Sequence, residues 1–100
     1  MDEGREPPIE RHDTDSKGRY VLKGPGGEVA ELSFTKVGAH QIIIDHTDVP
    51  DVFRGQGAGL KLVARAVADA RADGKTVIPL CPFANAQFRR HPEWADVLKR

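Results

Sequence analysis

The hydrophobic pattern of this chain changes from a period of two in its first half to a helical period in its second half. Residues 29–34 read Val-Ala-Glu-Leu-Ser-Phe, in which every second residue is apolar. This alternation predicts a half-buried strand. Residues 41–49 contain the run Ile42-Ile43-Ile44, which predicts a strand buried on both faces. Together with an ordered segment that begins at Tyr20, these segments predict a three-stranded meander.

Residues 57–73 are predicted to form a helix of about four turns. Their apolar residues recur at intervals of three and four, as on one face of a helix. They are Leu60, Val63, Val67 and Ala70. Gly74 follows, at the position of a left-handed C-terminal cap.

A fourth strand-forming segment follows this helix, over residues 76–80. A strand, a helix and a strand in this order predict a right-handed parallel crossover. Pro79 cannot donate a hydrogen bond to a strand ladder, so it is expected only where the neighbouring strand is missing or diverges. Short helices are predicted over residues 82–90 and 92–98, each with a proline near its first position.

Residues 1–18 are almost wholly polar and show neither the strand period nor the helix period. We expect them to form a flexible N-terminal tail. Residues 19–100 are expected to form one domain, because a chain of 100 residues has room for a single modest core.

Charge and apolar content limit the function classes. The 15 basic and 15 acidic residues give a formal net charge of zero, so we expect neither nucleic-acid nor membrane binding. No apolar run is long enough to span a membrane, and the first residues lack the apolar core of a signal peptide. One cysteine, Cys81, forbids an internal disulfide and fits a reducing compartment. We therefore expect a cytoplasmic protein.

Residues 49–59 read Val-Pro-Asp-Val-Phe-Arg-Gly-Gln-Gly-Ala-Gly and join the isoleucine-rich strand to the predicted helix. The first backbone N–H groups of a helix lack intrahelical partners and carry partial positive charge, which favours an anion. Gly55, Gly57 and Gly59 let the backbone approach a ligand closely, and Arg54 adds a cation. The alternatives are a tight turn without a ligand and an arginine that is a plain surface cation.

Two common phosphate loops are excluded by spacing. The dinucleotide fingerprint requires a glycine where Leu60 stands, and the nucleoside triphosphate loop requires Gly-Lys followed by Ser or Thr. Arg54, Gly57 and Gly59 spell Arg-x-x-Gly-x-Gly instead. This pattern resembles the pyrophosphate-binding motif of the GNAT acetyltransferase superfamily.

Three further blocks resemble a small single-domain branch of the same superfamily. Its members carry similar His-Thr-x-Val-Pro, Arg-Gly-x-Gly-x-Gly, Pro-Leu-Cys-Pro-Phe and Arg-Arg-His-Pro-Glu blocks. Here the three are His46-Thr47-Asp48-Val49-Pro50, Pro79-Leu80-Cys81-Pro82-Phe83 and Arg89-Arg90-His91-Pro92-Glu93. The similarity runs from about residue 20 to residue 98.

The resemblance implies a mixed α/β fold, a truncated GNAT acetyltransferase with an antiparallel meander, a parallel βαβ crossover and C-terminal helices. It also implies that acetyl-CoA lies in a cleft where two parallel strands splay apart, with pantetheine near the first strand and pyrophosphate at the glycine loop. The implied cofactor-binding residues are Asp48, Val49, Arg54, Gly55, Gln56, Gly57, Ala58 and Gly59.

Cys81 is the candidate nucleophile, because it precedes Pro82 at a predicted helix start, where positive potential stabilises a thiolate. The alternative is a small buried apolar residue. His46 is the candidate base, on the same strand face as Ile42 and Ile44 if no bulge intervenes. The alternative is a hydrogen-bonded structural histidine.

The sequence offers neither a metal-binding pattern nor the usual general acid. The histidines and Cys81 lack the spacing of metal-ligand pairs, so no metal is expected. Many larger GNAT enzymes protonate the departing thiolate with a tyrosine in the helix after the last core strand. The only tyrosine here is Tyr20, and that helix offers Gln87 and Phe88. Phe83 and Phe88 are expected in the core. For Arg89 and Arg90 the alternatives are contact with the anionic end of CoA, an exposed helix face and contact with a partner.

The predicted activity is transfer of an acetyl group from acetyl-CoA to an amine, either directly or through Cys81. The acceptor stays open between a peptide, a protein lysine and a small polyamine. The alternative is a non-catalytic module that binds or senses acyl-CoA, and an interaction domain without a ligand ranks last. We expect a monomer or a weak homodimer that pairs through an exposed sheet edge.

Overall fold

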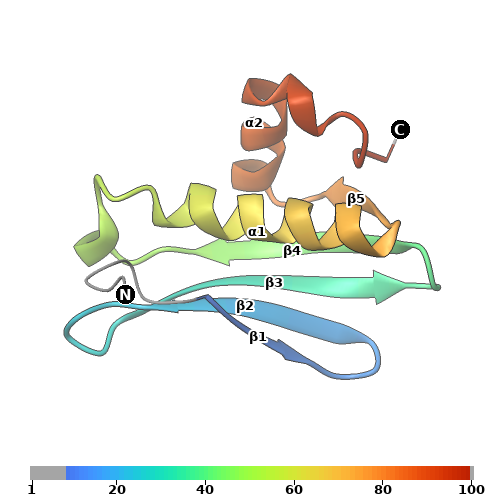
Figure 1. Cartoon of the computed structure of the whole chain (residues 1–100). Helices are drawn as coiled ribbons and strands as arrows, with labels where there is room; N and C mark the ends of the chain where they lie inside the picture. The colour runs from blue at the N-terminus through green and yellow to red at the C-terminus, as the bar shows by residue number, and fades with distance from the viewer. Residues whose placement is uncertain (1–8, 100) are drawn as a thin grey trace, which may run out of the picture.

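A five-stranded sheet and one long helix form the body of the computed structural model, which describes residues 9–99 (Figure 1). The strands are β1 (Glu10–Asp13), β2 (Lys17–Lys23), β3 (Val29–Val37), β4 (Gln41–Asp48) and β5 (Thr76–Pro79). They lie in sequence order across the sheet. Neighbours from β1 to β4 are antiparallel, and β4 pairs with β5 in parallel. The predicted fold class, a meander followed by a parallel crossover, is confirmed.

Two α-helices follow the meander. The long helix α1 (Ala58–Asp73) connects β4 to β5, and α2 (Pro82–Arg90) rises from the end of β5 beside α1 (Figure 1). Gly74 ends α1 at φ 69°, and its N–H donates to the Arg71 carbonyl at 3.3 Å. The predicted left-handed cap is therefore confirmed. Short 3₁₀ turns occupy Asp51–Phe53 and Pro92–Trp94.

The helix predicted over residues 92–98 is wrong beyond Trp94. The Val77 N–H donates to the Val97 carbonyl at 2.7 Å, and the Lys99 N–H donates to the Val77 carbonyl at 2.9 Å. These bonds draw the end of the chain alongside β5, where Leu98 forms an isolated parallel bridge with Val77. Pairing to the sheet therefore replaces the helical bonds that the local pattern favours.

The prediction of a flexible tail over residues 1–18 is wrong for residues 10–18, because β1 pairs with β2 and β2 begins at Lys17. Residues 1–8 of that prediction lie outside the described part. Charged contacts hold β1: the Arg11 guanidinium binds Asp13 at 2.8 Å and Asp69 of α1 at 3.0 Å. It also lies 5.4 Å from the centroid of the Phe34 ring. Hydrophobic periodicity cannot detect a strand that is fixed by charge.

The core lies between α1 and one face of the sheet. Its helix side differs from the predicted stripe in three places, because Leu60 is exposed and both Leu62 and Ala66 are buried. From the sheet, the buried residues that face α1 are Tyr20, Leu22, Ala30, Leu32, Phe34, Ile42 and Ile44. From α1, they are Leu62, Val63, Ala66, Val67 and Ala70.

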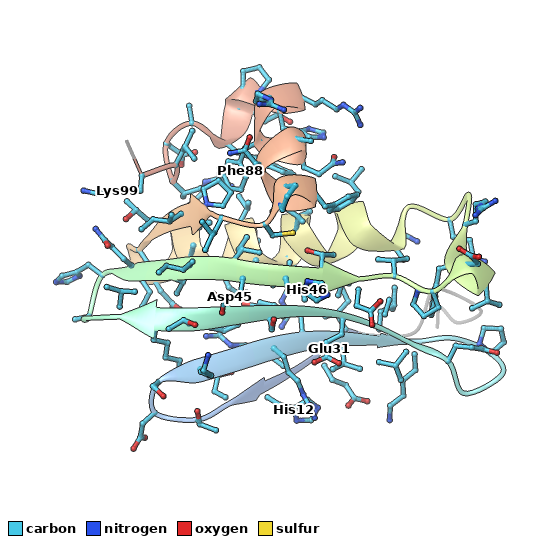
Figure 2. All side chains as sticks on the ribbon, turned by 180° about the vertical axis from the view of Figure 1, so that it is seen from behind. His12, Glu31, Asp45, His46, Phe88 and Lys99 are labelled. Carbon is cyan, nitrogen blue, oxygen red and sulfur yellow. The ribbon has the colours of Figure 1, made fainter. Side chains whose placement is uncertain are left out.

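The other face of the sheet is not covered by a helix within residues 9–99 (Figure 2). The expectation that β4 is buried on both faces is therefore wrong: Ile42 and Ile44 are buried, whereas Ile43 is only half-buried. None of the described helices is long and apolar enough to cross a bilayer.

Candidate functional site

A bulge divides β4 into two parts that present opposite faces. Ile44 pairs with Phe34 and His46 pairs with Ser33, so Asp45 has no partner across the ladder. The Thr35 hydroxyl donates to the Asp45 carboxylate at 2.6 Å and holds the bulge in place. An extra residue in one strand reverses the alternation of side chains beyond it. The residues after Asp45 therefore exchange faces.

The bulge turns His46 away from the core. His46 is exposed on the open face of the sheet, on the side that Figure 2 shows. The expectation that it shares a face with Ile42 and Ile44 is wrong, because a bulge does intervene. Thr47 takes the inward position instead, opposite Leu32. His46 therefore lies on the opposite face of β4 from Thr47, and we do not propose it as the general base.

Thr47 meets Cys81 inside the molecule. Cys81 caps the N-terminus of α2 and is 5% exposed. Its backbone N–H donates to the Ile44 carbonyl at 3.1 Å, and its thiol donates to the Thr47 hydroxyl with an Sγ–Oγ1 distance of 3.5 Å. These contacts hold Cys81 where the paired part of β4 and β5 ends, at Ile44 and Pro79. Pro79, which has no backbone N–H to donate, is the last residue of β5 that pairs with β4. A proline is tolerated at this position because the ladder ends there.

The surroundings of Cys81 alter its acidity. Burial disfavours the thiolate, but the hydrogen bond with the Thr47 hydroxyl and the backbone N–H groups of Ala84, Phe83 and Thr47 favour it. Their combined effect outweighs burial, so the pKa of the Cys81 thiol lies below its ordinary value. The sequence places Cys81 at a helix start that favours a thiolate, and in the structure the amides that do so include those of the first turn of α2.

The glycine loop leads into α1 through left-handed turns. Gly55 has φ 81° and Gly57, the N-cap of α1, has φ 70°. Such angles favour glycine. No side chain caps α1, and its first turn contains no acidic residue. Within residues 9–99, five amides of this segment have no hydrogen-bond acceptor: those of Gly55, Gly57, Ala58, Gly59 and Leu60.

A cavity of about 350 Å³ lies between this loop and α2. From the loop side it is lined by Val49, Phe53, Arg54, Gly55, Gly57, Ala58, Gly59 and Leu60. From α2 it is lined by Phe83, Gln87 and Arg90. The structure thus brings together six of the eight residues predicted for cofactor binding.

The other two predicted residues lie elsewhere. Asp48 is exposed at the end of β4, and Gln56 points to the opposite side of the loop, where its side-chain amide donates to the Val52 carbonyl at 3.2 Å. Arg54 lines the cavity but is also paired with Asp51 at 3.3 Å, with a side chain 80% exposed. Cys81 does not line the cavity.

Gly59 has a role that the sequence does not reveal. A Cβ atom there would lie 2.6 Å from the tip of the Phe83 ring. Glycine therefore lets α2 pack closely on the start of α1. Phe83 itself is 38% exposed at the cavity, which corrects its predicted place in the core.

Gln87 and Arg90 also line the cavity, and sequence reasoning gave Gln87 no binding role. Gln87 is 7% exposed, on the buried side of α2 with Ala84 and Phe88. A polar residue on the apolar stripe of a short helix is the signal that marks it. Among residues 9–99, no group forms a hydrogen bond with its side chain.

Comparison with known proteins decides the family. A family model described as GCN5-related N-acetyltransferase matches residues 19–97. This chain belongs to the GCN5-related N-acetyltransferases. Among solved structures, it resembles the NMR structure of a GCN5-like protein from Staphylococcus aureus that is assigned as an N-acetyltransferase. The two share 30% identity and a TM-score of 0.69, over 90% of this chain and 87% of the other. Functionally curated sequences give no significant match.

Membership in the GCN5-related N-acetyltransferases supports acetyltransferase activity. The family match runs from β2 to Val97 and so includes the bulge of β4, the glycine loop and α2. All of β1 lies before it.

Proposed function

We propose that this GCN5-related protein transfers the acetyl group of acetyl-CoA to an amine and that the cavity between the glycine loop and α2 holds the donor. The observation that carries the proposal is the uncapped start of α1, whose unpaired amides belong to residues that line this cavity. An uncapped helix N-terminus favours an anion. Arg54 and Arg90 add positive charge at the same cavity.

The pyrophosphate of CoA would bind the amides of residues 57–60. Its pantetheine arm would run toward Val49, which lines the other end of the loop segment. The ladder between β4 and β5 ends at Ile44 and Pro79. Beyond that point, the backbone groups of β4 that face away from β3 are not paired with β5, and those that Cys81 does not engage are left for the pantetheine amides.

We favour direct transfer as the route. A neutral amine attacks the thioester carbonyl carbon, and the tetrahedral intermediate gives one nitrogen proton to solvent water. The C–S bond then breaks and expels CoA thiolate, which takes up a proton from solvent. The products are an N-acetyl amine and CoA. Correct placement of the two reactants supplies most of the acceleration in such a scheme, and backbone N–H groups stabilise the oxyanion.

Tyr20 does not provide the acid. It is 1% exposed beneath α1, and its hydroxyl donates to Asp69 at 2.7 Å. Burial and this hydrogen bond raise the pKa of Tyr20. We therefore propose that the thiolate is protonated by solvent at the open rim of the cavity, since a CoA thiol is acidic enough to leave with little assistance.

The covalent alternative passes through Cys81. Its thiolate would attack the thioester, carry the acetyl group on Sγ while CoA leaves, and return as thiolate when the amine attacks the acetyl group. The lowered pKa of Cys81 supports this route. Its burial and its position outside the cavity weigh against it.

CoA release in the presence of acetyl-CoA and a panel of amines tests the activity, with wild type and Cys81→Ala side by side. The panel contains a lysine peptide, a polyamine and an amino acid. We expect release with at least one amine and an N-acetylated product of matching mass. Activity retained within a few-fold by Cys81→Ala supports direct transfer, whereas its complete loss with an acetyl adduct on the wild-type protein establishes the covalent route.

A non-catalytic acyl-CoA-binding module is the second candidate. The favouring observation is that no histidine, tyrosine or carboxylate lines the described cavity. Binding of acetyl-CoA without CoA release for any amine of the panel would establish this reading in place of the enzyme.

A further inference from the structure

Gln87 lies in an environment where an apolar residue would be more stable. Its neighbours on the buried side of α2 are Ala84 and Phe88, and the residue itself is 7% exposed. A buried carboxamide without hydrogen bonds destabilises a fold, because it loses its contacts with water. Leucine or methionine would fill the same place at no such cost.

The second carboxamide of α2 provides a contrast. Asn85 is half-buried, and its side-chain amide donates to the Pro79 carbonyl at 3.5 Å. Gln87 has no such partner anywhere within residues 9–99. The two residues share a helix and a functional group, yet only Gln87 lines the cavity.

Gln87 also differs chemically from the rest of the cavity wall. The anion-binding part of that wall consists of backbone N–H groups and two arginines, all of which only donate. Among the side chains that line the cavity, Gln87 alone carries an oxygen acceptor. A ligand N–H group that enters the cavity can therefore find a side-chain acceptor only at Gln87 Oε1.

We propose that Gln87 is a ligand-binding residue whose carboxamide pairs with an amide group of the pantetheine arm of CoA. A carboxamide donates and accepts at once, which matches the N–H and C=O of a ligand amide. This inference rests on the proposed function, because it assumes that the cavity holds CoA. It assigns to this chain's α2 a contact that is separate from the anion site at α1.

The proposal predicts opposite changes in stability and affinity. Replacing Gln87 with leucine removes an unpaired buried polar group, so the melting temperature of the free protein should rise by a few degrees. The same change removes the partner of the ligand amide, so the affinity for CoA should fall by roughly tenfold or more. Stability gained where binding is lost is typical of a functional position.

Calorimetric titration of wild type and Gln87→Leu provides the test, with two ligands. CoA contains pantetheine, whereas 3′-phospho-ADP keeps the nucleotide and diphosphate without it. We expect Gln87→Leu to weaken CoA and to leave 3′-phospho-ADP unchanged. Asn85→Leu is the matched control: it loses a protein hydrogen bond, so its melting temperature should fall while its CoA affinity stays unchanged. Gln87→Met repeats the test with an unbranched side chain if the leucine variant folds poorly.

The results distinguish a failure of the proposed function from a failure of the inference about Gln87 alone. If wild type binds neither ligand, the proposed function fails and this inference fails with it. If wild type binds CoA and both Gln87 variants bind it equally well, this inference alone fails. Equal weakening of both ligands also overturns it, because Gln87 would then act on the phosphates. A lower melting temperature of the free variants, with unchanged CoA affinity, would make Gln87 a structural residue.

Discussion

Thr47 reaches Cys81 because a single unpaired residue, Asp45, reverses the faces of β4 beyond it. Thr47 offers both a hydroxyl and a backbone N–H to the sulfur. Donors to a thiolate stabilise its charged form and lower its pKa. The acidity of Cys81 therefore depends on a residue whose orientation the alternating pattern misassigns.

Replacement of Thr47 by valine should raise the pKa of the Cys81 thiol, because the variant keeps the shape of the side chain and loses the hydroxyl. Thiolate absorbance at 240 nm measures the titration, and Cys81 is the only cysteine. Tyr20, the only tyrosine, does not interfere at neutral pH because its own pKa is raised. Thr47→Ser should keep the low pKa. An unchanged titration in Thr47→Val would show that the backbone donors alone set it.

At this scale the sequence predicts the tight turns at the loop glycines but not the orientation of the polar side chains. Gly55 and Gly57 adopt the left-handed angles for which glycine is chosen. His46 was misplaced because a bulge leaves no mark in hydrophobic alternation. The sequence does not mark Gln87 as a cavity residue, because its burial depends on how α2 meets α1, and residue spacing along α2 does not contain that information.

Among the elements, β1 shows most clearly what charge can stabilise. The hydrogen bond from Arg11 lowers the pKa of Asp13 to about 2, and Lys36 lies 2.9 Å from the same carboxylate. Arg11 in turn binds Asp69 on α1. Ion pairs thus attach the short edge strand β1 to the meander and to α1. The strands β2, β3 and β4 are instead held to α1 by apolar side chains.

Acid should release β1 before the rest of the sheet. A carboxylate with a lowered pKa stabilises the fold above its unfolded pKa, near 3.8, and loses this contribution as pH falls through about 2. The contribution of Asp13 is at most about 1 kcal/mol, because the pair is partly exposed to solvent. Amide exchange should show loss of protection in β1 over this pH range while β3 stays protected. Asp13→Asn should show the same loss of protection at neutral pH. If β1 were protected as well in that variant as in wild type, the claim that ion pairs hold β1 in place would be contradicted.

The order of strands and helices was predictable because their patterns are local: alternation in β3, a helical stripe in α1, a glycine after it. The edges of the sheet were not. β1 follows from contacts with residues as distant as Asp69, and the end of the chain follows from bonds to Val77. Such elements depend on partners far away in sequence, which no local period reports.

At the scale of the whole molecule, one face of the sheet is packed against α1 and the other is open. Two concave surfaces in different parts of the molecule are therefore candidate ligand sites. The cavity between the glycine loop and α2 belongs to the packed side. Another cavity of about 350 Å³ lies near β1 and β2 and is lined by His12, Lys17, Arg19 and Glu31, among others. Only the cavity at α1 combines a helix start, unpaired amides and Gln87. We therefore place the donor there.

The most direct test of this placement is titration of ¹⁵N-labelled protein with CoA, followed by amide chemical shifts. The largest shifts should fall on the loop and α2, at Gly55, Gly57, Gly59, Leu60 and Gln87 and its side-chain amide. Residues of β1 and β2 should stay unchanged. Shifts concentrated around Arg19 and Glu31, or no shifts at saturating CoA, would contradict the claim that the start of α1 and α2 together hold the acetyl donor.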